Sequence, residues 1–290
     1  MINSKKYAIK EDKKIDLNKL STKTTPYYKS KKEYKKILKK QIKQMSELQQ
    51  VHYASNKYSL LIIFQAMDAA GKDSTIRHVM SGINPQGCQV FSFKQPSKEE
   101  LDHDFLWRTN KSLPEKGRIG IFNRSYYEEV LVVKVHPELL KYQDLPNEVI
   151  NNKKLWEDRY LSINNLEKHL YQNGTVIIKF FLNVSKEEQK NRFISRIKEP
   201  SKNWKFSMSD VQERKYWDDY MRAYEMCINN TSKSHAPWYI IPADDKKNAR
   251  LIVSQVIIDT LKKLDIAYPK TSKDHVKKME DILKYLETGK

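Results

Sequence analysis

Long apolar runs, cysteines and glycines are all scarce in this sequence of 290 residues. Its longest apolar run, Leu60–Phe64, is far shorter than the roughly 20 residues that cross a bilayer, and no apolar core typical of a secretory signal is visible near the N-terminus. Two cysteines, Cys88 and Cys227, cannot form a disulfide framework, and the seven histidines show no metal-ligand spacing. The sequence therefore predicts a soluble, cytoplasmic protein that does not act on membranes.

Positive charge is abundant by contrast, since 54 Lys and Arg stand against 36 Asp and Glu and give a net charge of +18. Such a surplus indicates a polyanionic partner, such as nucleic acid, membrane headgroups or phosphates, although a lysine-rich genome would also produce it. Much of the excess lies in 29–43, where the spacing of Tyr34, Leu38 and Ile42 predicts an amphipathic helix with a basic, solvated face. Aromatic residues make up 11% of the chain, which excludes global disorder.

Short apolar segments alternate with helical patterns along the chain. The predicted strands are 58–64, 89–93, 119–122, 175–182 and 238–241. The predicted helices are 31–55, 71–82, 97–110, 146–173, 185–198, 207–229 and 248–264. This alternation predicts an α/β three-layer sandwich around a parallel sheet. We expect a basic N-terminal extension at 1–50 (an arm plus a helix), a core domain at 51–265 with a lid at about 190–230, and a charged tail at 266–290.

The loop after the first predicted strand has the features of a phosphate-binding loop. A strand, a short loop, Gly71-Lys72 and a helix would wrap backbone N–H groups around a phosphate, with Lys72 as a point charge. The strict pattern G-x-x-x-x-G-K-[ST] is missed twice, because Ala66 replaces its first glycine and Asp73 its hydroxyl residue. Asp68 would repel phosphate unless a cation lay between them, which predicts Mg²⁺. An ordinary helix start, with Asp68 capping the loop, is the alternative interpretation.

Two further clusters contain arginines. Asn123 and Arg124 follow the third predicted strand, at the edge where open α/β sheets bind ligands, so Arg124 is expected to clamp a phosphate. Glu128 would help to hold metal-bound water or would cap the next helix. Arg192 and Arg196 lie four residues apart on one helical face, before a short polar segment that ends near Lys205, and this arrangement is typical of a hinged lid. A surface salt bridge and a basic solvated helix are the alternatives for these arginines.

These segments resemble the polyphosphate kinase type 2 family over about residues 50–265. The blocks that carry the resemblance read FQAMDAAGKDST, GIFNRSYYEEVLVVKVHPE, KNWKFS and APWYIIPADDKKNAR. Within these blocks, FQAMDAAGKD and FNRSYYE are similar to the sequences of the branch that accepts AMP as well as ADP, often called class III. Other branches commonly have glycine at the position of Ala66 and aspartate at that of Asn123, which shifts the weight of metal binding to Asp68.

The resemblance implies a P-loop kinase fold with a helical lid, a polyphosphate donor, AMP, ADP and ATP as nucleotides, Mg²⁺ as the cofactor, and a homo-oligomer, either a dimer or a tetramer. The expected catalytic residues are Asp68, Lys72, Arg124, Arg192 and Arg196. The expected phosphate or nucleotide contacts are Ala69, Ala70, Gly71, Asp73, Ser74, Arg77, Asn123 and Lys205. Asp68 and Glu128 are the expected metal ligands.

Two other functions remain open at this point. An ATP-dependent P-loop kinase acting on a nucleotide or small molecule would use the same loop. Binding ATP, however, requires fewer cationic residues than binding a long polyanion. A nucleic-acid binder would explain the charge and the tyrosines, but it leaves the Gly-Lys loop without a role and no nucleic-acid-binding motif supports it. We therefore expect polyphosphate-dependent phosphoryl transfer and no binding of nucleic acid.

Overall fold

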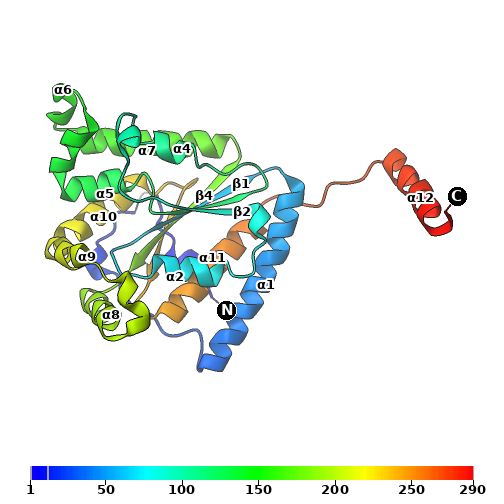
Figure 1. Cartoon of the computed structure of the whole chain (residues 1–290), viewed down its shortest axis with the longest axis horizontal. Helices are drawn as coiled ribbons and strands as arrows, with labels where there is room; N and C mark the ends of the chain where they lie inside the picture. Colours follow the sequence, from blue (N-terminus) through cyan, green and yellow to red (C-terminus); the bar gives the residue numbers. More distant parts are fainter. Residues whose placement is uncertain (1, 12, 290) are drawn as a thin grey trace.

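The computed structural model describes residues 2–11 and 13–289. Five parallel strands form one sheet in the order β2-β3-β1-β4-β5 (Figure 1). Their bounds are β1 Ser59–Gln65, β2 Cys88–Ser92, β3 Ile119–Asn123, β4 Thr175–Asn183 and β5 Trp238–Pro242. Every residue of the central strand β1 is buried, as its unbroken apolar run predicts. All five predicted strands are confirmed to within one residue at each end.

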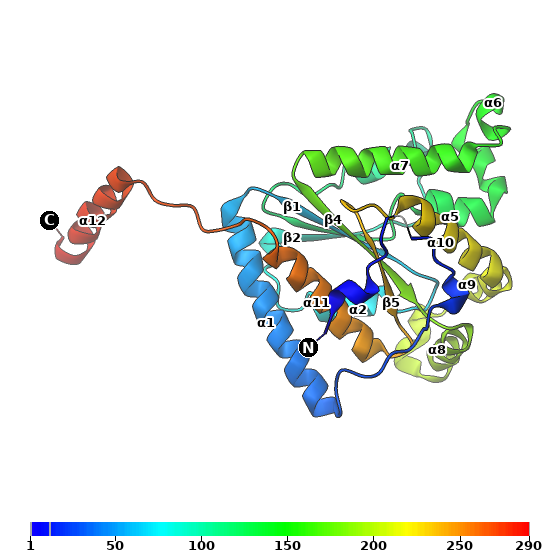
Figure 2. The same cartoon turned by 180° about the vertical axis from the view of Figure 1, so that it is seen from behind.

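Helices cover both faces of this sheet. The first layer consists of α1 (Lys31–Ser55), α2 (Lys72–Val79) and α11 (Lys246–Lys262), and the second of α5 (Glu128–Val135), α7 (Leu155–Gln172) and α10 (Trp217–Thr231) (Figures 1 and 2). The predicted α/β three-layer sandwich is therefore confirmed. The shorter or peripheral helices are α3 Lys98–Leu101, α4 Trp107–Asn110, α6 Asn147–Ile150, α8 Lys186–Lys198, α9 Met208–Glu213 and α12 Lys273–Thr288.

Three of the predicted long helices are wrong in their continuity. The helix expected at 97–110 is divided into α3 and α4, and the helix expected at 146–173 into α6 and α7. In each break a side chain satisfies a nearby backbone donor: Asp104 accepts from the Leu106 N–H at 2.9 Å, and Asn152 from the Lys154 N–H at 2.9 Å. Such local bonds compete with the helical ladder, so the chain turns before the next helix begins.

The third interruption shapes the segment predicted as a lid. The helix expected at 207–229 is divided into α9 and α10 by a 3₁₀ turn, Arg214–Tyr216. The Arg214 side chain donates to the Lys186 carbonyl at 2.9 Å and to Gln189 Oε1 at 2.7 Å, and both acceptors lie on α8. This contact ties the turn between α9 and α10 to α8.

The two ends of the chain differ in how they meet the body. The N-terminal arm contributes Tyr7 and Leu17 to the main hydrophobic core, and the Ile9 N–H donates to the Trp238 carbonyl of β5 at 2.8 Å. The tail predicted as charged contains the helix α12, which stands away from the body in Figure 1. None of the described helices is long and apolar enough to cross a membrane.

A buried ion pair links the second helical layer to the sheet. Lys179 on β4 and Glu167 on α7 are fully buried, and Lys179 Nζ donates to Glu167 Oε2 at 2.6 Å. The same ammonium donates to the Thr231 carbonyl at 2.7 Å, while Glu167 Oε1 accepts from the hydroxyls of Tyr126 and Tyr127. Burial lowers the pKa of Lys179, and the carboxylate of Glu167 opposes that effect. The network fixes the two tyrosines that follow Arg124 in the chain.

We expect Lys179→Met to lower the free energy of unfolding by about 3–5 kcal/mol, because it leaves the Glu167 carboxylate buried without its cation. Urea denaturation followed by circular dichroism measures the loss. The double variant Lys179→Met/Glu167→Gln should recover part of it, since no unpaired buried charge remains. Equal stability of the wild type and Lys179→Met would contradict the structural role of this pair.

Candidate active site

The loop between β1 and α2 has the backbone conformation of an anion-binding turn. Gly71 has a φ of +104°, which glycine adopts without a steric penalty, and Ala69 has a φ of +58°. The first turn of α2 then begins at Lys72, with its backbone N–H groups at the loop. Lys72 is only 9% exposed, and its Nζ donates to the Ala66 carbonyl at 2.7 Å. Burial, followed by the charge of Arg124, lowers the pKa of Lys72.

Arg192 holds this loop from α8. Its Nη1 donates to the carbonyls of Ala69 at 3.1 Å and Ala70 at 2.5 Å, and its Nη2 to those of Ala243 at 2.6 Å and Asp244 at 3.2 Å. Its Nε donates to Glu188 at 2.7 Å. Five acceptors therefore meet the five N–H groups of the guanidinium. A direct contact from Arg192 to phosphate would require one of these bonds to be shared or released.

Arg124, which follows the neighbouring strand β3, contacts one carboxylate of the loop and one at the start of α5. Arg124 Nη2 donates to Asp68 Oδ1 at 3.0 Å, and Nη1 lies 3.5 Å from Glu128 Oε2. The Arg124 side chain remains 40% exposed, so its outer face is open to a ligand. Burial by itself would lower the pKa of Arg124, but Glu128 and Asp68 outweigh it and raise the pKa. Arg124 also has a φ of +65°, a conformation disfavoured for a side chain of this size.

Asn123 lies beside the loop but does not contact Asp68 in the described structure. Its Nδ2 donates to Asp73 Oδ1 at 2.8 Å and to Ser92 Oγ at 3.3 Å. Its Oδ1 is buried and accepts no hydrogen bond from the described residues. Asn123 thus connects α2 to β2 through its amide nitrogen.

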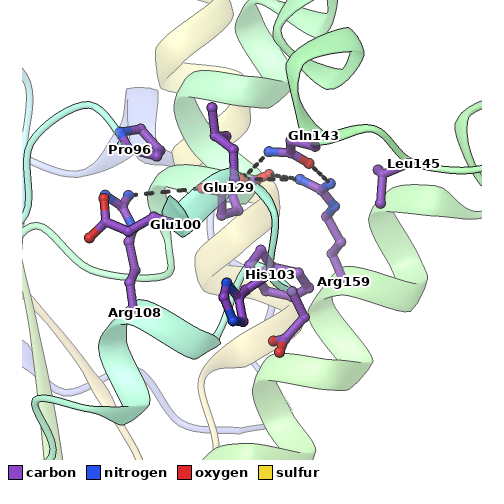
Figure 3. A pocket seen from close by; sticks show the side chains of 11 residues that line it. Pro96, Glu100, His103, Arg108, Glu129, Gln143, Leu145 and Arg159 are labelled. Carbon is purple, nitrogen blue, oxygen red and sulfur yellow. Dashed lines mark hydrogen bonds and ion pairs between the residues drawn. The ribbon is translucent and has the colours of Figure 1, made fainter. Parts of the chain in front are cut away.

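Glu129, the residue after Glu128, turns away from the groove and anchors α5. Its Oε2 accepts from Gln143 at 2.7 Å and lies 3.4 Å from Arg159, while Oε1 lies 3.9 Å from Arg108 (Figure 3). Burial raises the pKa of Glu129, and Arg159 opposes that effect. These contacts fix the first turn of α5 and with it the position of Glu128.

The segment predicted as a lid lies on the other side of the site. Arg196 on α8 donates to Asp210 Oδ2 on α9 at 3.1 Å, and Asp210 has its pKa raised by burial and by Asp68. On the far side, His136 Nε2 lies 2.9 Å from Glu213 Oε2, which joins the segment after α5 to the end of α9. The first contact therefore holds α9 to α8 within this segment, and the second joins the end of α9 to the body.

A groove with a volume of about 700 Å³ passes between the loop and the lid. Thirteen of the predicted site residues line it: Asp68, Ala69, Ala70, Gly71, Lys72, Asp73, Ser74, Arg77, Asn123, Arg124, Arg192, Arg196 and Lys205. The cationic residues among its lining are Lys72, Arg77, Lys94, Arg124, Arg192, Arg196, Lys202, Lys205 and Lys246, against the acidic Asp68, Asp73 and Asp210. The groove is therefore strongly basic.

A second cavity, of about 620 Å³, shares Lys94, Gln95 and Arg124 with the groove. Its walls include Val132, Val133 and Leu139 as well as Tyr142 and Glu128. A site with an apolar wall and a few polar groups of this size suits a small organic ligand. Glu128, the remaining predicted site residue, lies in this cavity and not in the groove.

Sequence reasoning missed Lys94, Arg108, Lys202 and Lys246 as site residues. Lys94 and Lys246 follow β2 and β5, so a signal was available: the carboxyl ends of parallel strands share one edge of the sheet. Desolvation, followed by the positive charge of Arg192, lowers the pKa of Lys246 to about 8.

This pKa predicts a pH dependence for any anion bound in the groove. Lys246 is charged below about pH 8 and neutral above it, so the apparent KM for a polyanionic substrate should rise by about fivefold between pH 7 and pH 9. Steady-state kinetics across this range measure the change. Lys246→Met should bind the polyanion weakly at every pH, so most of the pH dependence of KM should disappear. Lys246→Arg should shift the rise in KM to higher pH. An unchanged profile in both variants would contradict the assignment.

Comparison with known proteins agrees with this geometry. Residues 28–269 match the family described as "Polyphosphate kinase 2 (PPK2)". The chain is 60% identical to an ADP-polyphosphate phosphotransferase of Rhodopseudomonas palustris. The 271 aligned residues cover 93% of this chain and 94% of that protein. It is 40% identical to an AMP/ADP-polyphosphate phosphotransferase of Meiothermus ruber, over 91% of this chain and 95% of the other.

A solved structure shows the same fold. The crystal structure of polyphosphate kinase 2 from Arthrobacter aurescens TC1 superposes with a TM-score of 0.85, at 39% identity and over 93% of each chain. With its basic groove at the carboxyl edge of a parallel sheet, the chain belongs to the polyphosphate kinase 2 family.

Proposed function

We propose that this protein transfers the terminal phosphoryl group of inorganic polyphosphate to AMP or ADP, reversibly. The observation that carries the proposal is the position of Arg124, which lines both the basic groove and the second cavity. The groove suits a donor with many phosphates, because it offers more cations than a nucleotide triphosphate needs. The second cavity suits the acceptor nucleotide, whose base would lie against Val132, Val133 and Leu139.

The chemistry requires alignment and charge neutralisation more than a base. A phosphate oxygen of the acceptor attacks the terminal phosphorus, the bond from that phosphorus to the bridging oxygen breaks, and the shortened chain leaves with the negative charge. The second pKa of a phosphate monoester is about 6, so the attacking oxygen of AMP is already ionised at pH 7. Lys72 and Arg124 would neutralise the phosphoryl oxygens, and Arg196 and the lid would exclude water. Arg192 would act as a positioning residue that holds the loop.

We further propose that Mg²⁺ acts with these residues. Asp68, Glu128, Asp210 and Glu213 line one cavity of about 270 Å³ beside Arg124, and such an excess of carboxylates fits a hard divalent cation. No group of three ligating side chains is close enough to hold a metal alone in the part of the chain that the structure describes. Asp68 and Glu128 would therefore share the ion with phosphate oxygens. The ion would supply charge neutralisation on the phosphates when bound.

An assay with separated nucleotide products tests the proposal. Purified protein is incubated with Mg²⁺, long-chain polyphosphate and either AMP or ADP, and the products are resolved by anion-exchange chromatography. Formation of ADP from AMP, or of ATP from ADP, is the expected result. Transfer from ATP to a small acceptor with no product from polyphosphate would favour an ATP-dependent kinase instead.

Two wider proposals follow from the family resemblance. We propose that the protein assembles as a homo-oligomer, a dimer or a tetramer, and acts in the cytoplasm, where its nucleotide substrates occur. Light scattering coupled to size-exclusion chromatography measures the mass of the assembly. A single monomeric species at micromolar concentration would contradict the first proposal.

A further inference from the structure

The first turns of α1 carry more positive charge than the proposed reaction uses. Exposed lysines occupy most positions outside the buried stripe of this helix, and they are Lys31, Lys32, Lys35, Lys36, Lys39 and Lys40. None of these six has an ion-pair partner within 4.0 Å among residues 2–11 and 13–289. The one acidic residue in this stretch, Glu33, accepts from the backbone N–H of Lys29 at the start of the helix. Six unpaired lysines in three turns repel one another unless an anion lies beside them.

Hydrogen bonds connect this helix to the phosphate groove. Ser74 lines the groove and accepts from Arg250 Nη2 at 2.6 Å, and Arg250 Nη1 donates to the hydroxyl of Tyr34 at 3.3 Å. Tyr34 lies between Lys31 and Lys35 on α1. The cationic side chain of Arg250, on α11, therefore lies between the groove and α1.

The position of α2 shows which side of α1 continues the groove. The start of α2 reaches the level of Tyr34 through Arg250, and Gly82, just beyond its end, lies against Ile42: a Cβ at Gly82 would be 2.3 Å from Ile42 Cγ2. The far end of α2 therefore meets α1 at Ile42, and its start is joined to Tyr34 only through Arg250 of α11, so α2 lies on the Ile42 side of α1. With 100° per residue, Lys35 and Lys39 lie on the Ile42 side of the buried stripe.

Lys31 lies on the same side as Lys35 and Lys39, whereas Lys36 and Lys40 lie elsewhere on the helix. Lys36 and Lys40 fall on the face opposite the buried Leu38, which is directed away from the body. Lys35 and Lys39 have the same spacing of four residues, about 6 Å along the axis, as Lys36 and Lys40. The two pairs therefore have equal charge and equal spacing and differ in the side of the helix they occupy.

We propose that the Lys31, Lys35 and Lys39 side of α1 binds the distal part of a long polyphosphate chain whose terminal phosphate lies at the loop. This inference rests on the proposed function and adds to it a second binding surface outside the groove. Each phosphate placed beside a lysine releases counterions, and contacts on a chain already held at one end form at a high effective concentration. A short chain ends before it reaches α1. The surface therefore makes the enzyme prefer long chains.

A comparison of two double variants tests this proposal. Lys35→Gln/Lys39→Gln removes charge on the α2 side, and Lys36→Gln/Lys40→Gln removes the same charge on the outer face. Steady-state kinetics with ADP are measured for each, with long-chain polyphosphate and with a short linear oligophosphate, at several salt concentrations.

We expect the first variant to raise the apparent KM for long chains by about fivefold to tenfold, with the KM for short chains and kcat unchanged. The slope of log affinity against log salt should become shallower by about 1.4, the value for two phosphate contacts on a single strand. The second variant should change the KM for long chains by less than half as much.

Several results would overturn the proposal. An equal rise in both variants would assign the effect to net charge, and an equal rise for long and short chains would assign it to the groove. Loss of binding to single-stranded DNA or to anionic vesicles, with the KM for long chains unchanged, would assign the surface to a nucleic acid or to a membrane. A wild-type protein that transfers nothing from either chain length would refute the proposed function itself.

Discussion

Lys72→Met is expected to lower kcat for phosphoryl transfer from polyphosphate by about 10³-fold or more. Lys72 is the cation at the base of the groove, where burial removes the water that would otherwise screen it from a phosphate. Loss of a preorganised charge in such a place removes stabilisation of the transition state. Single-turnover kinetics with ADP measure the step itself.

The stability of the same variant separates catalysis from folding. Burial lowers the pKa of Lys72, so its charge does not stabilise the fold, and methionine should cost no more than the hydrogen bond from Lys72 to the Ala66 carbonyl. Lys98→Met, which changes a lysine outside the groove lining, serves as a control and should retain full activity. A Lys72→Met enzyme with near-normal kcat would contradict the assignment of this site.

Arg124→Ala should reduce kcat/KM by about 10³-fold, because Arg124 lies between donor and acceptor and its loss affects both. Arg124→Lys should recover only a small part, since an ammonium lacks the planar fork that bonds two oxygens. Measurement of KM for AMP and for polyphosphate separately shows whether both substrates are affected. A change in KM for only one substrate would contradict the position of Arg124 between the donor and acceptor sites.

The backbone of this residue provides a further control. Arg124 adopts a φ of +65°, so glycine at this position relieves strain while alanine does not. Arg124→Gly and Arg124→Ala should therefore differ in stability but share the same loss of activity. Different activities in the two variants would indicate that backbone strain, and not the guanidinium, controls the rate.

The sheet was predictable because its strands are short, apolar and bounded by polar residues. β1 reads as a buried strand on pattern alone, and the rule that parallel strands share a carboxyl edge then brings Lys72 and Arg124 to the same side of the sheet. The helix breaks at Asn152 and Asp104 were missed, because a single side-chain bond to a nearby N–H outweighs the helical pattern around it.

The environment of Arg192 could not be predicted from the sequence. Spacing places it on one helical face with Arg196, yet it is buried while Arg196 reaches the groove wall and Asp210. Its acceptors include the Ala243 carbonyl, which follows β5 and lies 51 positions away in sequence. The pattern of neighbouring residues in the sequence cannot predict a hydrogen bond to a carbonyl so far along the chain. The place of Lys246 after β5 was predictable, but its lowered pKa arises from burial and from Arg192, which the sequence does not show.

A crystal structure of the protein soaked with tripolyphosphate and Mg²⁺ tests the central claim most directly. We expect one phosphate within hydrogen-bonding distance of Lys72 Nζ and the first N–H groups of α2, with the rest of the chain in the groove toward Arg77 and Lys246. A tripolyphosphate bound outside this groove, with Lys72 still donating only to the Ala66 carbonyl, would contradict the account.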